Sequence, residues 1–202
     1  MTSPTSAKGQ STRTTIIDEA LSQASRIGLE ALSIGGLAKD VGMSKSGLFA
    51  HFDSKEDLQL QVLESSVERF VQHVIAPSLT EPRGVPRIRA FFENWLSWEH
   101  TLAGGCIFMQ LANELDDRPG PLREKLVAYQ RDWIEALSTA ADIAVAEGHF
   151  GDHFDREQFA YDMYSIMLAY HHFHRLLRDP DAERRARRAC EDLLAACASE
   201  GR

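Results

Sequence analysis

Apolar residues recur at spacings of three and four along almost the whole 202-residue chain, and strict alternation of apolar and polar residues is scarce. Spacings of three and four place side chains on one face of an α-helix, whereas alternation places them on one face of a strand. Hydrophobic residues make up 44% of the chain, close to the value for folded globular domains. The sequence therefore predicts an all-α protein.

The first predicted helix begins near Thr12, after a polar stretch, residues 1–11, that we expect to form a flexible leader. Gly28 suits the end of this helix. The apolar residues predicted on its inward face are Ile17, Ala20, Leu21, Ala24 and Ile27.

Two very short helices are predicted next. Ser33 is a suitable N-cap for the first, which Gly42 stops, and Ser44 is a suitable N-cap for the second, residues 45–51. Helices this short are marginal in water on their own, so they must be held by longer neighbours. Two short helices joined by a turn that contains glycine match the helix-turn-helix unit, whose second helix lies in the DNA major groove.

A long helix is predicted after the second short one, with Ser54 and Asp57 at its start and Pro77 as its end. The stretch that follows, up to Pro86, indicates a linker, and a domain boundary is expected between residues 70 and 85. The apolar stripe predicted along the long helix consists of Leu63, Val67, Phe70, Val71 and Val74.

Within the second short helix, Leu48 and the following Phe52 are predicted to point inward, and no acidic residue occurs between Asp40 and Asp53. A carboxylate would be repelled by DNA phosphates, whereas lysine side chains, hydroxyls and backbone amides bind them. We expect an outward face that contacts DNA. The predicted DNA-binding residues are Ser33, Ser44, Lys45, Ser46, Gly47, Phe49, His51 and Lys55.

The run "SIGGLAKDVGMSKSGLFAHFDSKEDL", residues 33–58, resembles the helix-turn-helix signature of the tetracycline-repressor-like (TetR) family. The preceding "TRTTIIDEALSQASRIGLEALS" resembles the first helix of that family. The resemblance implies a DNA-binding domain at residues 12–70, with its helix-turn-helix at about 33–52, and a ligand-binding and dimerisation domain at residues 71–202. It also implies a homodimeric repressor that binds a palindromic double-stranded DNA operator and is released by a small-molecule effector.

Two positions depart from the pattern of the family. Phe49 stands where the family usually has a tyrosine whose hydroxyl commonly reaches a phosphate, so one such contact is expected to be absent. Gly36 stands where the family often has an acidic or bulkier residue, and it should cost about 1 kcal/mol of helix propensity relative to alanine.

The formal net charge of −8 argues against indiscriminate binding to polyanions. Residues 1–79 carry a net charge of −2 and residues 80–202 a net charge of −6, so most of the excess lies outside the predicted DNA-binding domain. Interactions between exposed charges are largely screened beyond about 8 Å at physiological salt. We therefore expect binding that is specific for a site and weak elsewhere.

The second half of the chain is rich in aromatic residues on predicted helices, and apolar pockets between bundle helices commonly bind small molecules. The same residues could instead be ordinary core. The predicted ligand-pocket residues are Phe91, Trp95, Trp98, Phe108, Met109, Tyr129, Trp133, Tyr164 and His171.

The last two predicted helices each carry an apolar stripe that could form a four-helix interface between two copies, or could be buried within one chain. The predicted dimer residues are Met163, Ile166, Met167, Tyr170, Ala186, Cys190, Leu193, Leu194 and Cys197.

A second class of function remains open, because the histidine-rich run at residues 170–175 could belong to a helical metal or haem protein, or to an enzyme. Only His171 and His174 could share a helical face there, and His149 and His153 are near in sequence. We therefore predict no metal, no cofactor and no enzymatic activity. A third alternative is a small-molecule binder whose DNA-binding region has decayed.

The three cysteines have no CxxC spacing, which indicates reduced, mostly buried thiols rather than a disulfide framework. No apolar run is long enough to cross a bilayer and none forms a secretory signal, so we expect a cytoplasmic protein with no membrane contact.

Overall fold

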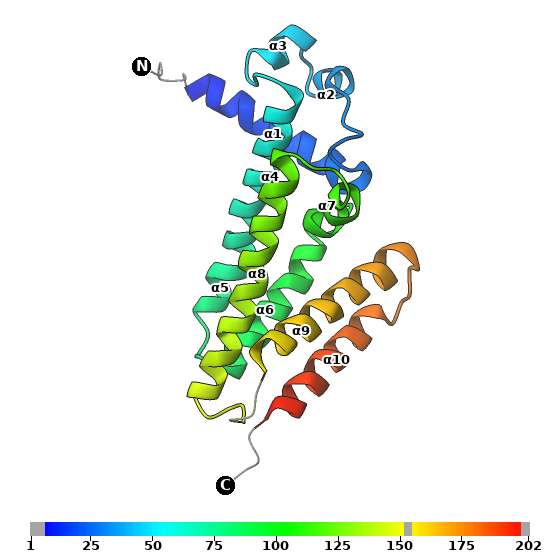
Figure 1. The fold of residues 1–202 in the computed structure, drawn as a ribbon. Coiled ribbons are helices and arrows are strands. Elements are labelled where there is room, and N and C mark those ends of the chain that lie inside the picture. Colours follow the sequence, from blue (N-terminus) through cyan, green and yellow to red (C-terminus); the bar gives the residue numbers. More distant parts are fainter. Residues whose placement is uncertain (1–6, 152–154, 199–202) are drawn as a thin grey trace. The chain divides into compact units, whose positions relative to one another are not determined.

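The computed structural model describes residues 7–151 and 155–198, and all regular elements in these ranges are helices (Figure 1). The all-α prediction is confirmed. An isolated bridge between Phe150 and Ala198 is the one strand-like pairing in the described ranges. The elements are α1 (Ala7–Ile27), α2 (Ile34–Asp40), α3 (Lys45–Phe49), α4 (Lys55–Phe70), the π-helix η1 (Val71–Ile75), α5 (Ala76–Leu79), α6 (Val85–Glu99), α7 (Ile107–Leu115), α8 (Pro121–Ala146), α9 (Arg156–His171), the π-helix η2 (His172–Leu176) and α10 (Ala182–Cys197).

The chain divides into two compact units. The first comprises Met1–Arg69 and Leu102–Leu126, and the second comprises Phe70–Thr101 and Val127–Arg202. The predicted division at residue 70 placed everything after it in one domain. In the structure, α7 and the first turns of α8 pack with the N-terminal helices instead.

Helix α1 begins five residues before the predicted Thr12, because residues 7–11 of the expected leader are already helical. Residues 1–6 of that leader lie outside the described residues. Ile16, rather than Ile17, is fully buried on the inward face, together with Ala20, Leu21 and Ala24. The prediction for Ile27 was wrong, since its side chain is 52% exposed.

Pro77 does not end the helical segment that begins at Lys55. The π-helix η1 interrupts the regular hydrogen-bonding pattern, and Pro77 lies in the first turn of α5, a position where proline is tolerated. Phe70 and Val74 are buried as predicted, whereas Val71 is 40% exposed and does not belong to the apolar stripe.

The second unit has an aromatic core. Phe70, Phe91, Trp98 and Trp133 meet edge to face, with ring centroids 5.1–5.6 Å apart. Such aromatic pairs add about 0.5–1.5 kcal/mol beyond area burial. Helices α9 and α10 lie side by side in this unit (Figure 1). A search of the described helices finds none long and apolar enough to span a membrane.

Candidate nucleic-acid interface

Three residues that the sequence predicted, Ser33, Gly42 and Ser44, set the ends of α2 and the start of α3. The Ser33 Oγ accepts a hydrogen bond from the Gly36 N–H at 3.3 Å, and the Ser44 Oγ accepts one from the Gly47 N–H at 3.1 Å. Each serine thus satisfies an otherwise free amide at a helix start. Gly42 adopts φ +70°, a left-handed conformation that glycine tolerates best.

This left-handed residue closes a Schellman motif at the end of α2. The Met43 amide donates to the Ala38 carbonyl at 2.7 Å, and the Gly42 amide donates to the Lys39 carbonyl at 3.0 Å. Two carbonyls at the helix end are therefore satisfied without help from another segment. The chain then enters α3 in a defined direction.

The inward residues of α2 and α3 hold both short helices against the first unit. Leu37 and Leu48 are completely buried, and Phe52 is 2% exposed. The Arg13 guanidinium of α1 lies over the Phe52 ring, 5.2 Å from its centroid. Helix α3 ends at Phe49, two residues before the predicted end at His51.

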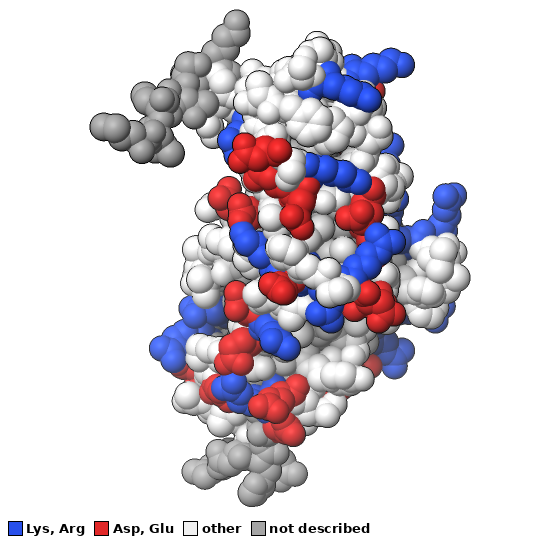
Figure 2. All heavy atoms as spheres, turned by 45° about the horizontal axis from the view of Figure 1, so that its top comes forward, with Lys and Arg blue, Asp and Glu red and all other residues white. Residues whose placement is uncertain are grey.

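Three residues on the other side of α3 are exposed: Lys45, Ser46 and Phe49, which we call the α3 outward face. The Phe49 side chain is 47% exposed. Gly47 and His51 are half-buried, and the Ser44 Oγ lies 3.1 Å from the Ser46 Oγ. Figure 2 shows that the visible surface over α2 and α3 carries basic atoms and almost no acidic ones.

Lys55, a predicted phosphate contact, also has a partner within the first unit. Its Nζ donates to the Glu30 carbonyl at 2.6 Å, so this ammonium group satisfies the backbone within the first unit. Lys55 therefore joins the start of α4 to the segment that follows α1, and it is not part of the α3 outward face.

Sequence reasoning missed the arrangement around residues 29 and 30. The Glu114 carboxylate of α7 accepts the Leu29 N–H at 2.9 Å and the Glu30 N–H at 2.6 Å. Gln59 of α4 donates to the Leu29 carbonyl at 2.9 Å, and Lys55 satisfies the Glu30 carbonyl. We call this set of contacts the Leu29–Glu30 junction.

No local signal could have revealed the junction, because Glu114 lies 85 residues from Leu29 in the sequence. A second contact supports it. Gly104 lies so close to α1 that a β-carbon at this position would be 1.7 Å from the Ser25 carbonyl oxygen, and its amide donates to the Ser25 Oγ at 3.2 Å. The N-terminal helices are thus held by a segment from beyond residue 100.

Comparisons with known proteins agree with this architecture. A profile of "Bacterial regulatory proteins, tetR family" matches residues 16–62, and a profile of "Tetracyclin repressor-like, C-terminal domain" matches residues 84–190, just over half of the chain. The chain belongs to the TetR family. A comparison with curated proteins finds no match.

Solved TetR-family structures share the fold over almost their whole length. A TetR transcriptional regulator from Chloroflexus aurantiacus is 25% identical, with 93% of this chain and 94% of that chain covered and a TM-score of 0.83. A TetR-family regulator from Cytophaga hutchinsonii is 18% identical, with coverages of 96% and 98% and a TM-score of 0.84. The protein AibR, solved in complex with isovaleryl coenzyme A and operator DNA, is 18% identical, with coverages of 93% and 98% and a TM-score of 0.71.

TetR-family proteins are DNA-binding transcriptional regulators and not enzymes, and the same holds for this chain. The resemblance noted in residues 12–70 is therefore confirmed at the level of the family. The helix-turn-helix described above lies within the N-terminal match, and most of the second unit lies within the C-terminal match.

The residues predicted to line a ligand pocket of the TetR type are divided between the two units. Phe108 and Met109 belong to the first unit, and the other seven belong to the second. Phe91, Trp95, Trp98 and Trp133 are buried, and much of this burial comes from the edge-to-face aromatic contacts. These residues thus contribute to the core of the second unit, and their role in a ligand pocket stays a prediction.

Polar groups are nevertheless buried in the second unit. The Glu99 carboxylate is fully buried, and its Oε1 lies 2.7 Å from Nδ1 of His171. Tyr164 donates to the Gln130 Oε1 at 3.0 Å. The Trp133 Nε1 is buried and has no hydrogen-bond partner within the described ranges.

Most of the predicted dimer residues are already buried within the single chain. Met163, Met167, Tyr170, Ala186, Cys190 and Leu194 are at most 5% exposed, so their side chains contribute mainly to the core of the second unit. Ile166, Leu193 and Cys197 are half-buried. Burial also raises the pKa of the Cys190 thiol to about 12, which keeps it protonated.

A different set of apolar side chains on α9, η2 and the residue after them is exposed to solvent. These exposed residues are Tyr161, Leu168, Phe173, Leu176 and Leu177, with exposed fractions from 43% to 70%. They are five of the nine large hydrophobic residues exposed in the described part of the chain. We call them the α9–η2 apolar row.

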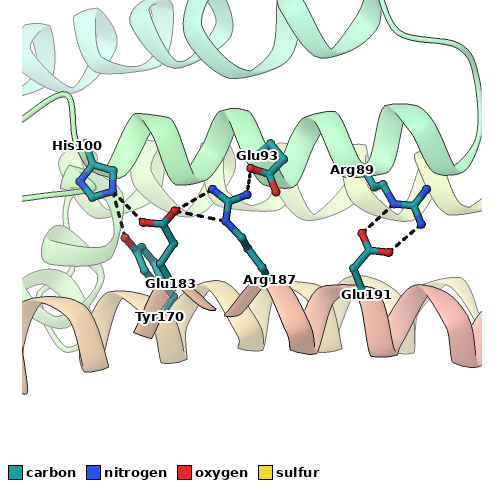
Figure 3. Close-up of polar contacts among 7 residues, drawn as sticks. All are labelled: Arg89, Glu93, His100, Tyr170, Glu183, Arg187 and Glu191. Carbon is teal, nitrogen blue, oxygen red and sulfur yellow. Dashed lines mark hydrogen bonds and ion pairs between the residues drawn. The ribbon is translucent and has the colours of Figure 1, made fainter. Parts of the chain in front are cut away.

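Charged contacts join α10 to α6 within the second unit (Figure 3). Arg89 donates to both carboxylate oxygens of Glu191, at 2.8 and 2.7 Å. Arg187 pairs with Glu93 and Glu183. Figure 3 shows that these pairs lie between α6 and α10.

Two histidines near this network contact a tyrosine. His100 Nε2 lies 3.2 Å from the Tyr170 hydroxyl, and the His174 ring stacks on the Tyr170 ring with centroids 5.1 Å apart. Among the residues that the structure describes, no group of three or more potential ligands could hold a metal ion. His153 lies outside these residues.

Proposed function

We propose that this protein is a ligand-responsive transcriptional repressor that binds a palindromic DNA operator as a homodimer and is released by a small molecule. One observation carries the proposal: the α3 outward face is exposed, free of acidic residues, and held in place by fully buried residues on its opposite side. A DNA duplex is the partner that such a face on the second helix of a helix-turn-helix suits.

Each exposed residue has a role that its chemistry allows. The Lys45 ammonium would bind a phosphate, and the Ser46 hydroxyl and the amides at the start of α3 would donate to phosphate oxygens. Gly47 would let the backbone approach the duplex closely. Two copies would place their α3 helices in successive major grooves, about 34 Å or a multiple apart, so the operator would have two-fold symmetry.

The α9–η2 apolar row supports a homodimer. Tyr161 and Leu168 are seven residues apart, and Leu176 and Leu177 follow Phe173 by three and four residues, which are helical spacings within each group. Exposed apolar surface on a folded domain can mark an interaction site. Helices α9 and α10 therefore remain the dimer helices of our proposal, together with the half-buried Ile166, Leu193 and Cys197. The contact would be made by their outward side chains.

The second unit is the proposed effector-binding unit, with Phe91, Trp95, Trp98, Tyr129, Trp133, Tyr164 and His171 as candidate contacts. A buried donor without a partner costs free energy, and an effector that carries a hydrogen-bond acceptor would satisfy the Trp133 Nε1. Binding would release the operator only if the effector had different affinities for the DNA-binding and the released conformations. The complex of AibR with isovaleryl coenzyme A and operator DNA shows that a protein of this fold binds both kinds of partner.

Selection of bound fragments from genomic DNA tests the proposal directly. The purified protein should enrich palindromic fragments, and Lys45→Ala should weaken binding and lower the slope of log K against log salt by about one per protomer. Arg131→Ala is the matched control, because Arg131 is an exposed residue of α8 in the other unit and its loss changes the net charge equally. The proposal is wrong if no palindromic fragment is enriched.

The dimer is tested by light scattering at a fixed protein concentration. Leu176 is 70% exposed, so Leu176→Glu should leave the fold intact and convert the dimer to a monomer. The control is Leu79→Glu at a residue of α5 that is 52% exposed and lies outside the row. A monomeric wild-type protein would contradict this part of the proposal.

Two alternatives are separated by the same preparations. A metal or haem protein would show bound metal and a visible absorption band. A small-molecule binder with a decayed DNA-binding region would bind no fragment specifically, and Lys45→Ala would change nothing. Because the proposed target is bacterial DNA, we infer a cytoplasmic location.

A further inference from the structure

Phe49 is an unusual residue on the surface of the first unit. A buried phenylalanine side chain stabilises a fold, yet this ring is 47% exposed while its neighbours Leu48 and Phe52 are buried. About half of the Phe49 ring therefore faces solvent and is available to a partner.

The neighbours of Phe49 show which partner the ring would meet. Phe49 follows Lys45 by four residues and Ser46 by three, so its side chain is a neighbour of both on the surface of α3. Lys45 and Ser46 can both bind phosphate oxygens, which makes this face the one that approaches a nucleic acid in the proposed function. In the proposed function α3 lies in the major groove, so the ring of Phe49 would enter the major groove with it.

The chemistry of a phenyl ring limits what it can recognise there. Phe49 has no hydrogen-bond donor or acceptor, so it can bind neither a phosphate oxygen nor the polar atoms of a base edge. The edges of the bases in the major groove are polar except for one group, the C5-methyl of thymine. An exposed apolar side chain on a major-groove helix has this methyl as its complementary partner.

We propose that Phe49 determines operator specificity by contacting the C5-methyl group of a thymine in each half-site. The proposal rests on the DNA-binding function proposed above and adds a base preference to it. The phosphate contacts of Lys45 fix the position of α3 without reading sequence. The Phe49 ring discriminates thymine from cytosine and from uracil at one base pair.

Uracil substitution in the operator isolates this contact, since uracil differs from thymine only by the methyl group. Each thymine of the selected operator is replaced in turn, in both half-sites, and binding of wild-type protein and Phe49→Ala is measured by fluorescence anisotropy. One symmetric pair of replacements should weaken wild-type binding about fourfold per half-site, or about 15-fold in total, as expected for loss of one buried apolar carbon. The same pair should leave Phe49→Ala binding unchanged.

One further variant and two further measurements separate base recognition from a structural effect. Phe49→Leu keeps an apolar side chain and should retain part of the sensitivity to uracil. Phe49→Ala should keep the salt dependence of the wild type, whereas Lys45→Ala should lower it. Circular dichroism of Phe49→Ala checks the fold, which an exposed ring should not affect.

The outcomes distinguish the two proposals. If the wild type binds a palindromic operator and no uracil replacement weakens binding, or if the same replacement weakens the wild type and Phe49→Ala equally, the role assigned to Phe49 is wrong and the proposed function stands. If the wild type binds no operator, both proposals are wrong.

Discussion

The substitution Glu114→Gln tests whether the Leu29–Glu30 junction holds the first unit together. The wild-type carboxylate accepts two backbone hydrogen bonds, from Leu29 at 2.9 Å and from Glu30 at 2.6 Å. Glutamine has nearly the same shape, but one of its two terminal atoms is a donor. That NH₂ group would face a backbone N–H, so one of the two hydrogen bonds is lost. The acceptor of the remaining hydrogen bond is then neutral.

The expected magnitude follows from the partners. A hydrogen bond to a charged group contributes about 1.5–3 kcal/mol, and a buried amide left unsatisfied keeps its desolvation cost. Leu29 is completely buried, which places this amide at the upper part of that range. A loss of this size corresponds to a population of locally opened molecules about 10-fold to 100-fold larger.

Amide hydrogen exchange measures that population at individual residues. Exchange of the Leu29 and Glu30 amides should accelerate about 10-fold to 100-fold in Glu114→Gln. Amides in the middle of α4 should change much less. The control is Glu68→Gln, which neutralises an exposed carboxylate of α4 in the same unit.

The reasoning is refuted if Glu114→Gln and Glu68→Gln give the same exchange rates at Leu29 and Glu30. It is also refuted if every amide of the first unit accelerates by the same factor. A uniform change would mean that Glu114 contributes only to global stability.

Three further predictions concern stability. Gly104→Ala would force a β-carbon against a carbonyl oxygen of α1, so it should lower the free energy of unfolding by about 1–3 kcal/mol or more. Urea denaturation measures this loss. The control is Gly151→Ala, which should be nearly neutral because the space around Gly151 is open. Burial lowers the pKa of His174 below its usual 6.5, so the unfolded chain binds the proton more readily, and the stability should fall as the pH decreases below about 6.5. His174→Gln should flatten that part of the pH profile, and an unchanged profile would contradict the reasoning. The exposed pair Arg89–Glu191 should show a coupling below about 1 kcal/mol in a double-mutant cycle, despite its two short hydrogen bonds, and a coupling above 2 kcal/mol would show that solvent screens it less than expected.

The helix-turn-helix could be predicted because its signals are local. A serine caps a helix through an amide three residues away, and Gly42 closes α2 through its own backbone conformation. These contacts depend on residues within one turn, so the printed sequence contains all the information they require. The inward orientation of Leu48 could be predicted in the same way, from its spacing to Phe52 one turn later.

Predictions failed where the neighbour came from elsewhere in the chain. The spacing of Ile27 and Val71 suited a buried helix face, but burial requires a partner segment, and both side chains are exposed. Pro77 predicted a helix end by a local rule, and the π-helix before it removed the conflict. The hydrogen bond from Lys55 to the Glu30 carbonyl was likewise not predicted, because the two residues are 25 positions apart.

The apolar stripes of α9 and α10 show the same limit for function. A dimer interface and a monomer core both require apolar side chains at helical spacing, so the sequence could not separate them. The structure buries Met163 and Leu194 within the chain and leaves Tyr161 and Leu176 exposed. The direction in which each stripe faces depends on which helix packs against it.

The sequence by itself determined the helical class, the caps and turn of the helix-turn-helix, and the absence of acidic residues around Lys45, since each depends on residues close together in the chain. Tertiary structure alone decided that Glu114 and Gly104 support the N-terminal helices and that the apolar row of α9 and η2 remains exposed. The physical reason is that long-range contacts depend on how whole helices pack, and packing selects one partner for each face from many that have the same polarity.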